Sequence, residues 1–148
     1  MFHIILFEPE IPPNTGNIMR LNVNTGNTLH LIEPLGFSIK DKDLKRAGMD
    51  YIKRSSFMTW VSLNECLMGI DKHNVYAVST KGKSLYSKQK YKSNDAFIFG
   101  PESRGLPLEV INSNKSIYIP MRKKGRSLNL ANAVSIIAYE GWRQLKFN

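Results

Sequence analysis

The chain has 148 residues, of which 42% are hydrophobic and 22% are charged, so it suits one soluble domain and excludes wholesale disorder. Lysine and arginine number 21 against 12 acidic residues, which gives a net charge of +9 and a pI near 9.7. This excess favours a polyanionic partner, most simply nucleic acid, although a basic protein without such a partner has the same composition. We expect a single domain over residues 1–148.

The cysteine and histidine content excludes several kinds of site. Cys66 is the only cysteine, so no internal disulfide can form, and we expect it to lie in the core. The histidines His3, His30 and His73 are scattered singly, and no metal site is expected.

The first apolar run, from Phe2 to Phe7, is too short for a signal peptide or a membrane span. We therefore expect a cytoplasmic protein with no membrane contact.

Short apolar runs alternate with helical stretches along the chain. Strands are expected at Phe2–Phe7, Thr28–Ile32, Val75–Ser79, Ala96–Phe99 and Ser116–Ile119. Helices are expected from Asn14 or Thr15 as the cap to about Asn24, and over Asp41–Ala47, Ser62–Ile70, Leu108–Asn112 and about Asn129 to Leu145. This alternation predicts an α/β fold, in which a mostly parallel sheet is flanked by helices.

Glycines and polar residues cluster just after the predicted strands. The clusters are Asn14–Gly16, Thr80–Gly82, Gly100–Gly105 and Met121–Ser127. Ligands bind at the carboxyl ends of strands in open α/β sheets, so these four segments are expected to form one functional rim. The alternative is that they are ordinary turns.

The last predicted helix is apolar or small on all sides in its first half, NLANAVSIIAY. A surface helix shows one apolar face, but this helix has two stripes at helical spacing. The stripes are Leu130, Val134, Ile137 and Leu145, and Ala131, Ser135, Ala138 and Trp142. We expect a second protomer to cover this helix, which predicts a homodimer.

Three segments contain polar and charged residues that are candidates for a functional role. Arg20 follows the turn PPNTG and would meet an anion there, or pair with Glu8 or Glu10; the two readings are equally open. In FGPESRGL, Glu102 is expected to pair with Arg104 or Arg126, and the segment is neither a GxGxxG fingerprint nor a P-loop.

The third segment is basic and precedes the last helix. Ser127, Asn129 and Asn132 exceed what one helix cap requires. A second basic stretch holds Lys72, Lys81, Lys83, Lys88, Lys90 and Lys92. A run of charge is usually a solvated face, but two runs beside ligand-facing loops favour a phosphate-binding surface.

These segments carry a resemblance to a known family. The sequence resembles the SPOUT superfamily of S-adenosylmethionine-dependent RNA methyltransferases, and within it the small tRNA (cytidine/uridine-34) 2'-O-methyltransferases. The resemblance covers essentially the whole chain and rests on the segments FEPEIPPNTGNIMRL, IEPLGF, RAGMDY, FGPESRGLP, IPM and RSLNLANAVSIIAYEGWRQL. It implies a parallel-sheet domain with a deep C-terminal trefoil knot, a feature that composition does not indicate.

The resemblance also implies roles for individual positions. Arg20 would act on the target ribose, with Ser127 and Asn129 near the transferred methyl. The cofactor S-adenosylmethionine would contact Val78, Gly100, Ile119, Met121, Ser127 and Leu128. The charge of the two basic stretches, and not the resemblance, predicts that phosphates of the RNA contact Lys81, Lys83, Arg122, Lys123 and Lys124. Arg126, next to Ser127, is instead expected to pair with Glu102 and hold the cofactor loop.

The implied reaction is direct methyl transfer, without a metal, to the ribose 2'-OH of the wobble nucleotide, a cytidine or modified uridine, in tRNA anticodon loops that include those of leucine tRNA. In this family Arg20 of one subunit would lie near the cofactor of the other. A guanidinium is effectively always protonated, so Arg20 is expected to grip the adjacent phosphate and polarise the hydroxyl. Two alternatives stay open: methylation of a base or of rRNA ribose, and RNA binding without catalysis.

Overall fold

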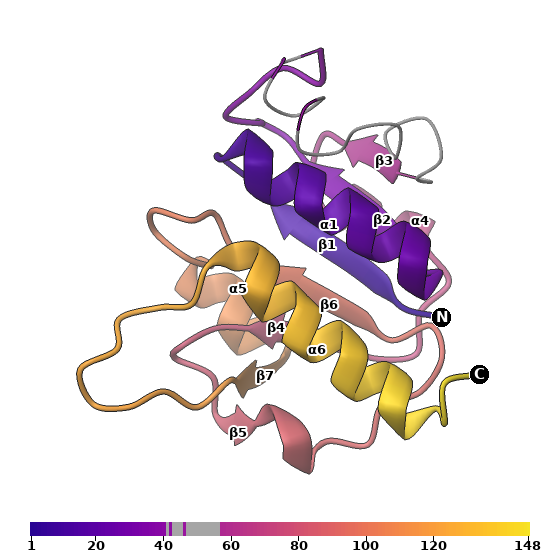
Figure 1. The fold of residues 1–148 in the computed structure, drawn as a ribbon, viewed down its shortest axis with the longest axis vertical. Coiled ribbons are helices and arrows are strands. Elements are labelled where there is room, and N and C mark those ends of the chain that lie inside the picture. Colours follow the sequence, from indigo (N-terminus) through magenta and orange to yellow (C-terminus); the bar gives the residue numbers. More distant parts are fainter. Residues whose placement is uncertain (41, 43–45, 47–56) are drawn as a thin grey trace.

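A computed structural model describes residues 1–40, 42, 46 and 57–148, and its centre is a sheet of seven strands (Figure 1). The strands are β1 (His3–Phe7), β2 (Thr28–Ile32), β3 (Phe57–Trp60), β4 (Val75–Val78), β5 (Ser84–Leu85), β6 (Ala96–Phe99) and β7 (Lys115–Tyr118). Their order is β3-β2-β1-β6-β4-β7-β5, and every pairing is parallel. The predicted α/β class and parallel sheet are confirmed, whereas the knot implied by the resemblance stays a prediction.

Helices cover both faces of this sheet. They are α1 (Pro12–Thr25), α4 (Leu63–Gly69), α5 (Leu108–Ser113) and α6 (Leu130–Gln144), with a 3-10 turn η1 (Tyr86–Lys88). Figure 1 shows α1 and α6 in front of the sheet and α4 and α5 behind it. Alternate residues of β1 explain this arrangement, because Leu6 packs with the α6 residues Val134 and Ile137, whereas Ile5 packs with Cys66 and Ile111 on the other face.

The cysteine lies where the sequence predicts. Cys66 belongs to α4 and is fully buried in the core on the inner face of that helix. Burial raises the pKa of its thiol to about 12, because the thiolate would lose its hydration. Cys66 therefore acts as a small apolar core residue.

The structure adds two strands that the sequence analysis does not predict. β3 lies at one edge of the sheet and exposes its two central residues, so its sequence lacks a continuous apolar run. β5 lies at the other edge and has two residues. The predicted helix Asp41–Ala47 and the RAGMDY segment lie outside the described residues, apart from positions 42 and 46.

The predicted cap of α1 is wrong. The helix begins at Pro12, with Ile11 as the N-cap and no side-chain cap hydrogen bond. Proline is favoured in the first turn of a helix because its φ is already helical and the missing N–H would have no helical partner. Asn14 thus lies inside the first turn, and its side chain is available for a contact elsewhere. The helix ends at Thr25 and is followed by the C-cap Gly26, whose φ of 70° is the left-handed conformation that glycine favours.

The sequence predicts isolated histidines, but His3 on β1 and His30 on β2 are in contact in the structure. Trp60 Nε1 donates to His30 Nδ1 at 3.1 Å, and His30 Nε2 lies 3.0 Å from His3 Nδ1. His3 Nε2 lies 2.9 Å from the carbonyl oxygen of Asp71. An indole N–H can only donate, so His30 accepts from Trp60 at Nδ1 and donates from Nε2 to His3. His3 in turn accepts at Nδ1 and donates from Nε2 to the Asp71 carbonyl. This arrangement requires both histidines to be neutral.

Acid should destabilise the protein through this histidine pair. Burial lowers the pKa of His30 from 6.5 to about 4, so the unfolded chain takes up a proton that the folded chain excludes. The contribution of His30 should therefore lower the free energy of unfolding by about 3 kcal/mol as the pH drops from about 6.5 to about 4. Denaturant unfolding at stepped pH measures this.

A matched histidine provides the control for this measurement. His73 is exposed, so His73→Gln should keep the full pH dependence, while His30→Gln should lose most of it between pH 6.5 and 5. An unfolding free energy of the wild-type protein that stays constant across this range would contradict the account.

Candidate active site

A cavity of about 450 Å³ lies at the carboxyl ends of the neighbouring strands β1, β6, β4 and β7. Its walls come from the start of α1, the loops after β4, β6 and β7, and the start of α6. The lining residues are Ile11, Asn14, Val78, Ser79, Thr80, Phe99, Gly100, Pro101, Glu102, Ser103, Arg104, Gly105, Leu106, Ile119, Met121, Ser127, Leu128, Asn129, Leu130 and Ala133. The predicted meeting of four segments at one rim is confirmed, although Asn14 lies in the first turn of α1 and not in a loop. The volume suits a small ligand.

The structure brings most of the predicted site residues together. All six positions expected to contact the cofactor line this one cavity: Val78, Gly100, Ile119, Met121, Ser127 and Leu128. Asn129, expected near the transferred methyl, lines it as well. Their roles stay predictions, but their convergence from four separate chain segments is an observation.

Gly100 allows the wall after β6 to form. A Cβ placed on Gly100 would lie 2.3 Å from the backbone nitrogen of Leu106, because the loop folds back on its own start. Gly105 closes this turn by donating its N–H to the Pro101 carbonyl at 2.9 Å, with a φ of 68°. Only glycine fits at position 100 without displacing backbone.

Glu102 has partners that the sequence analysis does not predict. Its carboxylate accepts hydrogen bonds from Glu10 N at 2.9 Å, from Ile11 N at 3.1 Å and from Asn14 Nδ2 at 3.1 Å. The expected pairs with Arg104 or Arg126 are wrong: Arg104 instead contacts Glu8 and lies 3.8 Å from Glu10. Two backbone donors and an amide satisfy this carboxylate.

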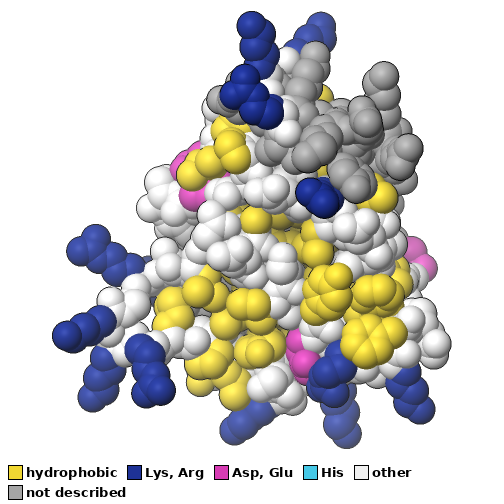
Figure 2. Space-filling view, in the orientation of Figure 1, with side chains coloured by type: hydrophobic (Ala, Val, Ile, Leu, Met, Phe, Trp, Pro, Cys, Tyr) yellow, Lys and Arg dark blue, Asp and Glu magenta, His cyan; other side chains and the backbone are white. Residues whose placement is uncertain are grey.

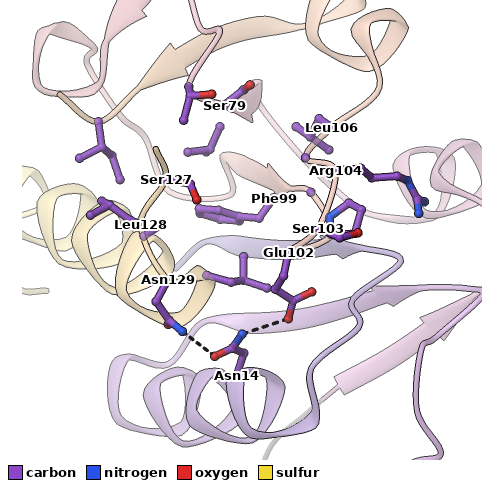
Figure 3. Close-up of a pocket in the computed structure, with 18 of the residues that line it drawn as sticks. Asn14, Ser79, Phe99, Glu102, Ser103, Arg104, Leu106, Ser127, Leu128 and Asn129 are labelled. Carbon is purple, nitrogen blue, oxygen red and sulfur yellow. Dashed lines mark hydrogen bonds between the residues drawn. The ribbon is translucent and has the colours of Figure 1, made fainter. Parts of the chain in front are cut away.

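Asn14 and Asn129 extend this contact across the cavity wall (Figure 3). Asn129 Nδ2 donates to Asn14 Oδ1 at 2.9 Å, and Asn129 Oδ1 caps α6 by accepting from Ala131 N and Asn132 N. The chain Glu102–Asn14–Asn129 therefore ties the β6 loop to the first turns of α1 and α6. Each of the three quoted motifs, NTGNIMR, FGPESRGL and SLNLAN, contributes one member of it.

Of the residues predicted to take part in the methyl transfer, Arg20 is the one that does not line the cavity. It is exposed on α1, whereas Asn14 on the same helix is buried and lines the cavity. The alternative that Arg20 pairs with Glu8 or Glu10 is not favoured, because Arg104 contacts both carboxylates. The expected action of Arg20 on the target ribose therefore stays a prediction, because Arg20 does not line the cavity of its own chain.

The predicted phosphate-binding residues are exposed and flank the cavity in sequence. Arg122, Lys123 and Lys124 lie between the lining residues Met121 and Ser127, in a turn closed by Gly125 N donating to Arg122 O at 2.8 Å. Lys81 and Lys83 follow the lining residue Thr80. Figure 2 shows cationic side chains gathered over the loop between β7 and α6 and near β5, around an apolar centre.

The cavity lining is almost free of titratable groups. Glu102 and Arg104 are its only acidic or basic side chains, and both are held by other parts of the chain. The remainder consists of apolar groups, hydroxyls, amides and backbone. Within the described ranges, no three of the His, Cys, Asp and Glu side chains are grouped so as to hold a metal ion, and no helix is long and apolar enough to cross a membrane.

Comparison with known proteins shows the family of this chain. The model of the SpoU rRNA Methylase family matches residues 1–139. A curated relative from Aeromonas hydrophila, a tRNA (cytidine(34)-2'-O)-methyltransferase, is 49% identical over 150 residues, which cover 99% of this chain and 96% of the relative.

Solved structures agree with this. A structure reported for the 2-OH methylation of C/U34 on tRNA superposes with a TM-score of 0.95 and 42% identity, covering 100% of this chain and 98% of that one. An AdoMet-bound rRNA methyltransferase from Sinorhizobium meliloti superposes with a TM-score of 0.86 and 25% identity, over 97% of this chain and 56% of that one.

The parallel sheet with its loop-lined cavity is thus the fold of an RNA methyltransferase. The chain belongs to the SpoU rRNA Methylase family. The resemblance drawn from the sequence motifs is confirmed.

Proposed function

We propose that this protein transfers a methyl group from S-adenosylmethionine to the ribose 2'-OH of nucleotide 34, a cytidine or uridine, in the anticodon loop of tRNA. The observation that carries the proposal is the convergence of Gly100, Ser127, Asn129 and their neighbours on one cavity, in a chain 49% identical over its length to a tRNA (cytidine(34)-2'-O)-methyltransferase. The proposal treats residues 1–148 as one methyltransferase domain, includes leucine tRNA among the substrates, and places the reaction in the cytoplasm, where tRNA is matured.

The cavity fits the cofactor. Its volume of about 450 Å³ lies within the range of small-molecule sites. The tight Gly100–Leu106 loop lines the cavity along its whole length, and Val78, Ile119 and Leu128 offer apolar contact. When bound there, S-adenosylmethionine supplies a methyl on an electrophilic sulfonium sulfur.

The protein's part in the reaction is placement and proton handling. The 2'-oxygen must lie in line with the methyl, and its proton must leave. No cavity side chain is available as a base, because Glu102 accepts three hydrogen bonds and Arg104 contacts Glu8. Arg20 is proposed to supply the missing contact by gripping the neighbouring phosphate and polarising the hydroxyl, while Ser127 and Asn129 border the methyl.

Arg20 is proposed to act at the cavity of a partner subunit in a homodimer, since it is exposed on α1 and does not line the cavity of its own chain. The surface of α6 also supports a homodimer, but through a different face from the one that the sequence predicts. Val134 and Ala138 are 0% exposed against the chain's own core, so a second protomer does not cover them. The face left for a partner carries the half-buried Ser135 and Tyr139, which is 47% exposed.

Ser135→Glu should therefore convert the protein to a monomer with little activity, because a buried charge without a partner is costly. Light scattering at micromolar concentration measures the mass. Ser87→Glu, on the exposed η1 turn, is the control and should stay dimeric. A monomeric wild-type protein would contradict the dimer.

The basic loop is proposed to bind RNA backbone. Replacing Arg122, Lys123 and Lys124 with alanine should weaken tRNA binding for all sequences alike. The slope of log affinity against log salt should shrink by about 0.7 to 0.9 for each lost contact. Lys115→Ala is the control, since its Nζ donates to Asn74 Oδ1 at the opposite end of β7. An unchanged slope in the triple variant would make the loop a solvated turn.

Calorimetry with S-adenosylmethionine separates an enzyme from a non-catalytic RNA-binding protein. We expect a one-to-one binding isotherm per chain, because the cavity is complete within one protomer. The absence of binding heat together with intact tRNA binding would favour the non-catalytic alternative.

A further inference from the structure

The loop after β6 is fastened to the segment after β1 by three consecutive residues. Glu102 accepts from the backbone N–H groups of Glu10 and Ile11, at 2.9 and 3.1 Å. Ser103 donates in the opposite direction, from its backbone nitrogen and its Oγ to the Glu10 carboxylate, at 3.1 and 2.6 Å. The two segments therefore exchange hydrogen bonds in both directions along one wall of the cavity.

Arg104 completes this contact with charge. One guanidinium nitrogen hydrogen-bonds to Glu8 Oε2, and another lies 3.8 Å from Glu10 Oε1. Figure 3 shows the Arg104 side chain extending from the loop away from Ser127 and Leu128. Two carboxylates compensate its charge, so Arg104 is poorly suited to capture a phosphate and well suited to hold the loop.

The backbone of Glu8 supports the same conclusion. Glu8 has a φ of 48°, a left-handed conformation that costs a side-chain-bearing residue free energy and that glycine adopts freely. The position is held by a hydrogen bond from Glu8 N to Ile32 O at 3.1 Å. A glutamate at a position that favours glycine indicates that its carboxylate is needed, and its observed partner is Arg104.

We propose that Arg104 is a positioning residue for the cofactor: with Glu8 and Glu10 it forms a clasp that holds the Gly100–Leu106 loop in the shape that binds S-adenosylmethionine. This inference rests on the proposed function. The loop contains two glycines and lines the cavity along its whole length. Contacts with another segment therefore reduce the conformational entropy that the loop would lose on binding the ligand. Loss of the clasp raises the free energy of ordering the loop around the ligand without changing the reacting groups.

The test is Arg104→Ala, followed by calorimetry with S-adenosylmethionine and by steady-state kinetics. We expect the Kd and the KM for S-adenosylmethionine to rise about 2- to 5-fold, the size expected for a partly exposed ion pair, while kcat at saturating cofactor is kept. Arg143→Ala is the matched control, because Arg143 forms an exposed ion pair with Glu140 within α6 and should leave Kd and KM unchanged.

A double-mutant cycle with Glu8→Gln identifies the partner. In the Glu8→Gln background, Arg104→Ala should have little further effect on Kd. An unchanged Kd in Arg104→Ala, or a fall in kcat with an unchanged Kd, would overturn the inference and leave the proposed function standing. A wild-type protein that does not bind S-adenosylmethionine would overturn the proposed function and this inference with it.

Discussion

Arg20→Ala is expected to reduce methyl transfer about 100-fold or more, while the Kd for S-adenosylmethionine stays at the wild-type value. The large loss follows because the cavity lining offers no other charged group to act on the ribose: Glu102 and Arg104 are both held by the chain. Cofactor binding should be spared because Arg20 does not line the cavity. Single-turnover transfer to tRNA and calorimetry measure the two quantities separately.

Two controls define the role of Arg20 further. Arg20→Lys keeps the charge but loses the planar fork that grips a phosphate with two N–H groups, so we expect it to recover a small part of the activity. Mixing Arg20→Ala subunits with Gly100→Ala subunits should restore activity in hybrid dimers, because one intact cavity then faces one intact Arg20. Mixtures that stay inactive, or an Arg20→Ala variant with wild-type turnover, would remove Arg20 from the chemistry across subunits.

Gly100→Ala is expected to weaken S-adenosylmethionine binding about 10- to 100-fold and to reduce methyl transfer with it. An added Cβ would lie 2.3 Å from Leu106 N and 2.4 Å from Gly105 C, both backbone atoms, so the loop must move. Overpacking of this kind costs about 1 to 3 kcal/mol, and each 1.4 kcal/mol lost from binding is a factor of about ten. Calorimetry measures the affinity, and circular dichroism confirms the fold.

Gly125→Ala provides the matched control for this substitution. Gly125 lies in the loop between β7 and α6, where an added Cβ would approach Arg122 O at 3.2 Å, and a small shift relieves that contact. Its cofactor affinity should therefore stay near the wild-type value. A folded Gly100→Ala variant that binds S-adenosylmethionine normally would show that the loop after β6 does not form the cofactor site.

The sequence predicts the parts of this fold that are fixed by local burial. β1 and β6 read as continuous apolar runs because parallel strands are covered on both faces. The start of α6 is predicted because Asn129 is a cap whose side chain accepts from the first turn. β3 is not predicted because it lies at an edge of the sheet and exposes its central residues. Its sequence therefore lacks the apolar run that indicates a buried strand.

The cavity is predictable only in part. Loop glycines and polar residues after the strands indicate the rim, because strand ends meet at one edge of a parallel sheet. The side-chain partners across the rim depend on distances in the folded chain, which proximity in the sequence does not predict. Arg104 lies two positions from Glu102 but contacts Glu8, and Glu102 accepts a hydrogen bond from Asn14. The pairing of His3 with His30 likewise depends on the register of β1 against β2.

Methyl transfer to nucleotide 34 is tested most directly by mass spectrometry of the product. Purified protein is incubated with unmodified tRNA and S-adenosylmethionine that carries a deuterated methyl, and the tRNA is digested to nucleosides and to oligonucleotides. The account predicts one deuterated methyl per tRNA, on the ribose of the cytidine or uridine at position 34. A label on a base or at another position, or no label with a protein that binds both S-adenosylmethionine and tRNA, would contradict it.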